Sequence, residues 1–262
     1  MTEAGQAPLV RTETAGGICT VTLDSTHNAN ALSTGLLTRL RVALDRAMSD
    51  PGVRLVVLTG AGKVFCAGAD LKEALTNPAG ATSLMSGIVE LLWDSSKPVI
   101  CRVNGAARAG GIGLVAACDI AIAVDRASFA FSEVRIGVVP AVISVPCLRR
   151  MPSRAAAEYF LTGEVFGAAR ATEIGLLTRA VPAGKLDAEI ARYTRMLLLG
   201  APGALAGTKG VLREVPAQGV AAGLAAMAEL SARYFGSDEA REGMTAFAAK
   251  RDPAWVPADL DG

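Results

Sequence analysis

The stretch PVICRVNGAARAGGIGLVAACDIAIAV, residues 98–124, contains two apolar runs separated by a glycine-rich turn and a short helical segment. The runs PVICRV (98–103) and IAIAV (120–124) are nearly free of polar residues, which is typical of strands that are buried on both faces. Such strands belong to parallel sheets, whose successive strands are joined by helical crossovers. This stretch therefore predicts an α/β fold.

The segments that precede it extend the same pattern. LVVLTG (55–60) is another apolar strand that runs into glycine, and a helix is expected from about residue 82 to 94. LVRTET and ICTVTL flank a pair of glycines within residues 9–23 and predict a hairpin. Apolar residues recur every three or four positions over 36–48, behind the capping residue Ser33, and predict an amphipathic helix.

After Pro140 the pattern changes to helical periodicity, rich in Ala, Leu and Arg. Helices are expected over 153–161, 184–199, 202–213, 220–234 and 238–250. We therefore predict a core over residues 1–200 that contains the site, a helical C-terminal region over residues 201–262, and an irregular tail from Pro253.

Composition narrows the function. The chain has 26 basic and 25 acidic residues, a net charge of +1 that argues against binding nucleic acids or anionic membranes by bulk electrostatics. A single histidine excludes a His-rich zinc site. No apolar run reaches the roughly 18 residues of a membrane span. The five cysteines are scattered, an odd number that indicates a reducing compartment. We expect a cytoplasmic protein without nucleic-acid or membrane partners.

Two glycine-rich turns each follow a strand, FCAGADLK at 65–72 and NGAARAGGIG at 104–113. A glycine-rich turn that opens a helix presents backbone N–H groups at the positive end of the helix dipole, which suits an anion or a developing oxyanion. Neither turn has the Gly-Lys-Ser/Thr pattern of a phosphate loop. Close packing of a helix on a strand explains either turn, taken alone, equally well.

Taken together, eight motifs occur in a fixed order from about residue 8 to residue 251. They are ANALS (29–33), LVVLTG, FCAGADLKE, KPVICRVNG, AGGIGLVAACDIAIA, FAFSEVRIGVVPA, FLTGEVFGAARATEIGLL and REGMTAFAAKR. This series resembles the crotonase superfamily, the enoyl-CoA hydratases and isomerases. The resemblance implies a spiral of ββα units followed by a helical trimerisation region. It also implies assembly as a homotrimer or a dimer of trimers, and leaves open which of the two forms.

The resemblance also assigns roles to the glycine-rich turns. In the family, the thioester carbonyl of an acyl-CoA accepts hydrogen bonds from two backbone N–H groups, and the matching positions are Ala69 and Gly110. One such donor lowers the barrier by about 3–4 kcal/mol. Coenzyme A enters as part of the substrate, so no separate cofactor and no metal are expected. The other positions that the resemblance assigns to CoA are Ala67, Asp70, Leu71 and Lys72, together with Phe247 and Lys250, which match positions reaching the CoA of an adjacent subunit.

Proton transfer is the step in which this chain departs from familiar hydratases, which hold the attacking water between two glutamates. The matching positions here are Gly113 and Glu133. We predict Glu133 as the catalytic acid/base, with a pKa raised by burial beside the acyl chain, the alternative being a solvent-exposed carboxylate. Gly113 transfers no proton, and we expect it to contribute to substrate binding by leaving room for a bulky acyl group.

Two arginines, Arg108 and Arg135, flank the two motifs. Relatives that hydrate branched, acidic acyl-CoA substrates have similar segments, and a guanidinium binds a carboxylate bidentately. Arg108 and Arg135 are therefore candidates for holding a substrate carboxylate. Ordinary solvation or pairing at the surface explains them equally well.

Three functions follow from these expectations. An enoyl-CoA hydratase is preferred, because hydration is the commonest activity in the family. A Δ3-Δ2 enoyl-CoA isomerase is the alternative, because a single glutamate is enough to move a proton between two carbons. The third is an acyl-CoA-binding trimer without catalytic activity, in which the missing acid at Gly113 marks the loss of catalysis.

Overall fold

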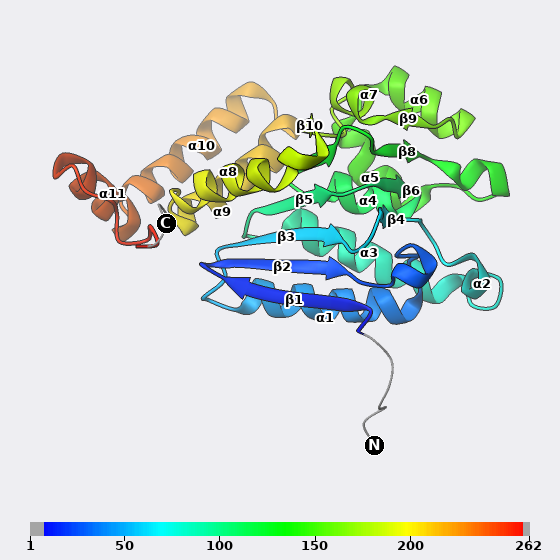
Figure 1. The fold of residues 1–262 in the computed structure, drawn as a ribbon. Coiled ribbons are helices and arrows are strands. Elements are labelled where there is room, and N and C mark those ends of the chain that lie inside the picture. Colours follow the sequence, from blue (N-terminus) through cyan, green and yellow to red (C-terminus); the bar gives the residue numbers. More distant parts are fainter. Residues whose placement is uncertain (1–7, 259–262) are drawn as a thin grey trace.

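Strand–strand–helix turns repeat three times along the chain, which is seen here in a computed structural model that describes residues 8–258 (Figure 1). The first turn comprises β3 (Leu55–Gly60), β4 (Val64–Cys66), α2 (Leu71–Ala74) and α3 (Pro78–Asp94). The second comprises β5 (Val99–Val103), β6 (Ala106–Arg108) and α4 (Gly110–Ala117). The third comprises β7 (Ile120–Val124), β8 (Ser128–Ala130), the 3₁₀ helix η2 (Ser132–Ile136) and α5 (Ala141–Arg150).

Each turn contributes one strand to each of two sheets. The first strands join a six-stranded sheet in the order β1-β2-β3-β5-β7-β10, and the second strands join a four-stranded sheet in the order β4-β6-β8-β9. The remaining members are β1 (Val10–Ala15), β2 (Ile18–Leu23), β9 (Phe166–Gly167) and β10 (Arg179–Val181). All pairings are parallel except β1 with β2 and β8 with β9. The predicted α/β class with a largely parallel sheet is confirmed.

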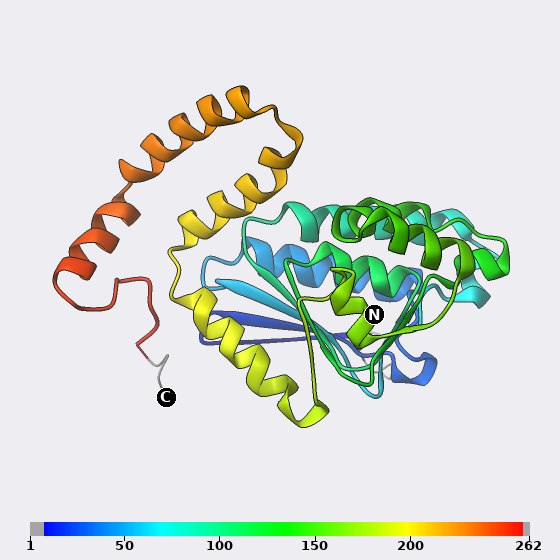
Figure 2. The same cartoon turned by 90° about the horizontal axis from the view of Figure 1, so that it is seen from above.

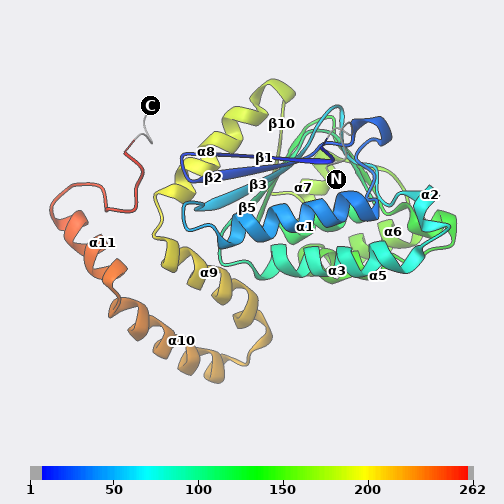
Figure 3. The same cartoon turned by 90° about the horizontal axis from the view of Figure 1, so that it is seen from below.

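The N-terminal hairpin and the first long helix also form where the sequence predicts them. Gly16 and Gly17, with φ of +53° and +78°, make the turn between β1 and β2, which requires left-handed backbone at both positions. Helix α1 (Thr34–Ser49) begins where the Ser33 hydroxyl accepts a hydrogen bond from the Leu36 amide. Its apolar face is buried, and it lies beside α3 (Figure 3).

Several elements were not predicted, and two kinds of them bear on the site. The strands β4, β6 and β8 have three residues each, too few for an alternating pattern to stand out from the glycine-rich turns around them. Helix α5 contains Pro146, a residue that removes a backbone donor and that usually ends helices. Both kinds of element matter for the site. The strands β4 and β6 lead into the glycine-rich turns, β8 leads into η2, and α5 packs against α4, which follows the second turn.

Further helices complete the chain. They are α6 (Ser153–Thr162), α7 (Ala168–Glu173), α8 (Leu186–Leu198), α9 (Pro202–Glu214), α10 (Val220–Phe235) and α11 (Asp238–Ala248). Helices α9, α10 and α11 extend away from the sheets as an arm (Figure 2). The arm exposes large apolar side chains, among them Leu224, Phe235 and Phe247. The division at residue 200 and the role of this region in trimerisation stay predictions. Within residues 8–258, none of the helices is both long and apolar enough to span a bilayer.

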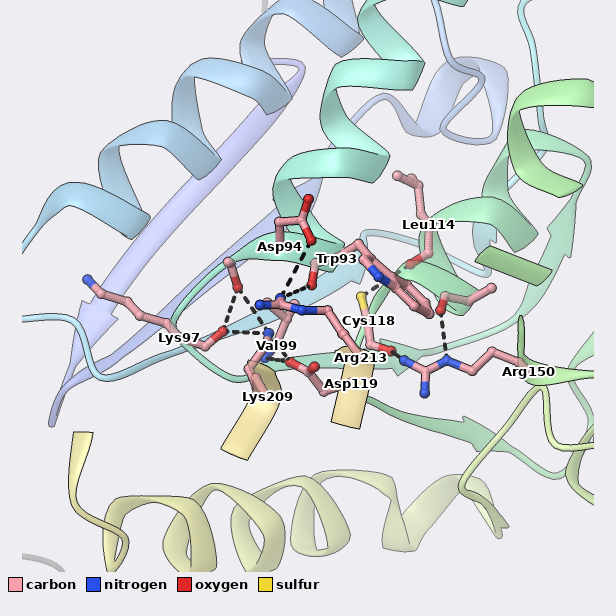
Figure 4. A network of polar contacts seen from close by, with 12 residues as sticks. Trp93, Asp94, Lys97, Val99, Leu114, Cys118, Asp119, Arg150, Lys209 and Arg213 are labelled. Carbon is pink, nitrogen blue, oxygen red and sulfur yellow. Dashed lines mark hydrogen bonds and ion pairs between the residues drawn. The ribbon is translucent and has the colours of Figure 1, made fainter. Parts of the chain in front are cut away.

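A buried ion pair joins the arm to the sheets (Figure 4). Lys209 on α9 is 7% exposed, and its Nζ lies 2.6 Å from Oδ2 of Asp119, at the start of β7. The same ammonium donates to Ser95 Oγ at 3.1 Å and to the Lys97 carbonyl at 3.0 Å. Asp119 Oδ2 also accepts from the Val99 amide at 2.7 Å. All three protons of the ammonium are therefore used at the point where the arm meets the ends of α3, β5 and β7.

Candidate functional site

The two glycine-rich turns lie against each other. They do so because β4 and β6 are parallel neighbours, so that both turns leave the same edge of the four-stranded sheet. Gly68 has φ +92°, and a Cβ there would lie 3.0 Å from the Ala109 Cβ and 3.1 Å from the Arg108 carbonyl oxygen. Glycine is thus required at 68 both for its backbone angle and for the close approach of the second turn.

Each turn contributes one residue to the lining of the same pocket. Gly110 is the first residue of α4, so no carbonyl one turn earlier is available to its N–H. Ala109 before it has φ +48° and ψ −119°, a strained conformation that fixes the direction of that amide. In the bridge between Leu32 and Ala69, the hydrogen bonds use the amides of Leu32 and Asp70. Ala69 and Gly110 both line the pocket.

The pocket beside these amides has a volume of about 200 Å³ and a mostly apolar lining. Leu37 of α1, Met85 of α3 and Ile143 of α5 form its buried floor, with exposures of 1%, 6% and 4%. Among the described residues that line it, Thr82 and Glu133 are the polar side chains. Acyl chains fit such a lining, with very few polar groups available for chemistry.

Glu133 supplies the one carboxylate of this lining. It lies in η2, and its Oε2 atom is buried without a hydrogen-bond partner among residues 8–258. Burial raises the pKa of the Glu133 carboxyl above its ordinary value, an effect that a hydrogen bond from its own backbone amide partly offsets. A carboxyl with a raised pKa takes up a proton more readily than an exposed one does. The prediction that burial would raise this pKa is in line with the structure, whereas the catalytic role stays a prediction.

The cysteines near the site are not activated. Burial raises the pKa of the Cys66 thiol to about 12. Burial, together with the nearby charge of Glu133, also raises the pKa of the Cys147 thiol on α5. Both side chains therefore stay protonated and act as small apolar groups.

Asn30 positions the backbone around β4. It belongs to the ANALS motif, and no function was predicted for it. Its side chain is fully buried, donates to the carbonyls of Ala61, Val64 and Phe65 at 2.9–3.2 Å, and accepts from the Ser25 amide at 2.9 Å. These bonds hold β4 and the first glycine-rich turn behind it. The signal for Asn30 in the sequence was a polar residue between two small apolar residues in ANALS.

Of the first turn, only Ala69 lines the pocket; the residues around it lie outside the lining. Asp70 caps α2, because its Oδ1 accepts from the amides of Lys72 and Glu73. Ala67, Leu71 and Lys72 are exposed and lie outside the lining. Their assignment to CoA stays a prediction.

Three other predicted substrate residues are not brought to the pocket. Arg108 donates to the Ser128 carbonyl at 2.6 Å and to the Ser128 hydroxyl at 2.9 Å, which ties β6 to β8. Arg135 donates to the Thr162 carbonyl at 3.1 Å. Gly113 lies behind the pocket, and the space beside its Cα is filled by Ile143. The expectation that Gly113 leaves room for a bulky acyl group is therefore wrong, because a neighbouring helix already occupies that room.

Phe247 and Lys250 lie at the far end of the arm, on and just after α11 (Figure 2). Phe247 is 87% exposed, and neither residue lines the pocket of its own chain. Contact with the CoA of an adjacent subunit stays a prediction.

Comparison with known proteins gives a consistent result along almost the whole chain. Residues 13–257 match the sequence profile of the family described as enoyl-CoA hydratase/isomerase. A Thermus thermophilus protein with the provisional name enoyl-CoA hydratase is 38% identical over 91% of this chain and 97% of its own length. A carnitinyl-CoA dehydratase of Proteus mirabilis is 33% identical over 92% of this chain and 96% of its own. The crystal structure of an enoyl-CoA hydratase from Shewanella pealeana superposes with a TM-score of 0.90, at 32% identity, covering 95% of this chain and 97% of that one.

Proposed function

Since this chain belongs to the enoyl-CoA hydratase/isomerase family, we propose that it is an enoyl-CoA hydratase, which adds water across the α,β double bond of an acyl-CoA thioester. One observation carries the proposal: the unpartnered, buried carboxylate oxygen of Glu133 belongs to the same small pocket as Ala69 and Gly110. That pocket thus combines a proton carrier with two backbone positions suited to holding an oxyanion.

In the proposed reaction, the thioester carbonyl accepts hydrogen bonds from the amides of Ala69 and Gly110. The Glu133 carboxylate takes a proton from water while the water oxygen forms a bond to Cβ, and the π electrons move to the thioester oxygen as an enolate. The two amides stabilise this oxyanion, because its charge is greater than that of the starting carbonyl. Protonated Glu133 then returns its proton to Cα, which restores both the thioester and the carboxylate.

The test replaces Glu133 and measures hydration of a short 2-enoyl-CoA. Glu133→Gln keeps the shape of the side chain and removes the proton carrier, so we expect kcat to fall by about 10²–10⁴-fold. Binding of a saturated acyl-CoA should persist. Glu164→Gln, a change at an exposed glutamate outside the pocket, is the matched control. Unchanged turnover in Glu133→Gln would overturn the assignment.

A second candidate, Δ3-Δ2 enoyl-CoA isomerisation, is favoured because Glu133 is the one carboxylate among the described residues that line the pocket. Here Glu133 would take a proton from C2 of a 3-enoyl-CoA and return it to C4, while the same two amides hold the dienolate. Adding a 3-enoyl-CoA to the purified protein separates the candidates: migration of the double bond without hydration of a 2-enoyl-CoA selects the isomerase. Binding of both substrates without turnover of either selects the inert acyl-CoA-binding protein.

A further inference from the structure

The floor of the pocket rests on a bare stretch of helix α4. Gly110 and Gly113 are one turn apart on that helix, so they share one face. A Cβ built at Gly113 would lie 2.9 Å from the Ile143 Cβ, closer still to the Ile143 Cγ2 atom, and 3.2 Å from Met85 Cε. Contacts this short do not occur between real side chains, so Ile143 occupies the volume that any side chain at 113 would need.

Ile143 is held firmly in this position. It is 4% exposed and lies on α5, where a β-branched side chain has one strongly preferred rotamer. Ile143 packs against the backbone of α4 at Gly113. Because a backbone does not move aside as a flexible side chain does, it limits how far Ile143 can shift. Among the three side chains of the buried floor, Ile143 is therefore the one that lies closest to the backbone of α4 at Gly113.

The lining also restricts the charge of what enters. Its one ionisable group is the Glu133 carboxylate, and none of the described residues that line the pocket is a lysine or an arginine. A second carboxylate on the acyl group would lie close to that of Glu133 without a cation between them. Arg108 and Arg135 are the two arginines that were candidates for holding a substrate carboxylate. Each instead donates a hydrogen bond to a carbonyl of its own chain.

We infer that Ile143, seated against Gly113, is the residue that limits this site to short, uncharged acyl chains. The inference rests on the proposed acyl-CoA chemistry. A pocket of about 200 Å³ is consistent with it, because sites for drug-sized ligands usually enclose 300–1,000 Å³. Removing the Ile143 side chain beyond Cβ should extend the pocket toward the backbone of α4 at Gly113 and lengthen it.

The test measures binding of saturated acyl-CoAs, which cannot react, to the full-length protein by titration calorimetry. We expect the original protein to bind butyryl-CoA in preference to octanoyl-CoA. In Ile143→Ala the ratio of the two dissociation constants should shift toward octanoyl-CoA by roughly 10- to 50-fold, since each buried methylene changes affinity by about fourfold. Val145→Ala, on the same helix but outside the lining, is the matched control and should leave the ratio unchanged.

Two further measurements keep the inference falsifiable. Gly113→Ala should push Ile143 into the pocket and weaken butyryl-CoA binding while leaving the affinity for free CoA unchanged. Ile143→Val, a smaller change, should shift the ratio in the same direction as Ile143→Ala and serves if the alanine variant does not fold. An unchanged ratio in a folded Ile143 variant overturns the inference, and so does binding of glutaryl-CoA as tight as that of butyryl-CoA.

Failure of the proposed function gives a different result. If acyl-CoAs bind with the expected length dependence and no enoyl-CoA is turned over, the hydratase proposal fails and the role of Ile143 stands. If no acyl-CoA of any length binds, both are overturned.

Discussion

Glu133 is the residue in which stability and the proposed function oppose each other. Its buried Oε2 atom has no partner among the described residues, and desolvation raises the pKa of its carboxyl. The charged form is therefore less favourable in the folded protein than in the unfolded chain. A group with a raised carboxyl pKa destabilises the folded state once the pH is high enough to ionise it.

Glu133→Gln should accordingly make the protein more stable at neutral pH. Below the ordinary carboxyl pKa, Glu133 is protonated in both states, so the two proteins should unfold at the same temperature there. As the pH rises through the ordinary value and then through the raised one, the original protein should lose stability relative to the variant. Thermal unfolding measured from pH 4 to pH 8 checks this, and a variant that is less stable at pH 7 would contradict it.

Asn30 contributes in the opposite sense, because its buried side-chain amide is hydrogen-bonded to four surrounding backbone groups. In Asn30→Ala, the carbonyls of Ala61, Val64 and Phe65 lose their shared donor, and the Ser25 amide loses its acceptor. Unsatisfied buried groups cost about 1–3 kcal/mol each, with partial relief from relaxation, so we expect a loss of about 2–4 kcal/mol in unfolding free energy. Urea unfolding checks this value. Asn104→Ala, where the amide makes a single exposed bond to the Gly62 carbonyl, is the control and should cost much less.

At the scale of elements, helix α4 acts through the side chains it lacks. Its glycines let three neighbours approach closely: Leu32 beside Gly110, Cys66 beside Gly111 and Ile143 beside Gly113. A helix dipole and first-turn amides would be present in any helix here, whereas the close approach of these three neighbours requires glycine. The glycines of α4 thus serve close packing. Oxyanion binding at Gly110 belongs to the proposed function, and the sequence alone could not separate the two explanations.

Gly111→Ala tests this packing directly. The new Cβ would lie 2.8 Å from the Cys66 Cβ and 3.1 Å from the Cys66 carbonyl oxygen, so α4 must move away from β4. The overpacking should cost about 1–3 kcal/mol even though alanine favours helix over glycine. Displacement of Gly110 should lower kcat/KM by roughly 10- to 100-fold. At Gly184 nothing lies within 4 Å of an added Cβ, so Gly184→Ala should change neither quantity appreciably.

Particular elements show how far the sequence predicts this protein. The apolar strands and long helices follow from local patterns, and the motifs indicate Ala69, Gly110 and Glu133, which the structure places around one pocket. The three-residue strands and helix α5 do not follow from local patterns. Contacts with residues that are distant in the sequence decide where they form. The consequence of Gly113 could not be predicted either, since it depends on Ile143, which lies 30 positions later and reaches α4 only through the packing of α5.

At the scale of the whole molecule, polar contacts attach the arm and the chain on either side of it to the core. Lys209 and Asp119 form a buried pair, and Arg54 donates to the carbonyls of Gly200 and Trp255 at 2.7 and 2.6 Å. The pair joins α9 to the ends of three core elements (Figure 4). Burial lowers the pKa of the Lys209 ammonium, and the charge of Asp119 opposes that effect.

Lys209→Met should be strongly destabilising, because it leaves Asp119 partly buried without its cation. Removing one partner of a buried pair typically costs about 3–5 kcal/mol, and the remaining bond from the Val99 amide places the expected loss near the lower end. Urea unfolding measures it. Lys185→Met, at an exposed lysine, should change the unfolding free energy by less than about 0.5 kcal/mol.

The spiral topology has a consequence for how the chain assembles. Strands β2, β3, β5 and β7 are adjacent in the larger sheet in the order in which they occur along the chain. Each turn therefore completes its pairing with the turn made just before it, and no strand up to β7 waits for a later one to fill a gap. A chain emerging from the ribosome can add strands to its sheets one turn at a time. In the larger sheet, the growing edge at any moment is then the edge that the next turn will cover.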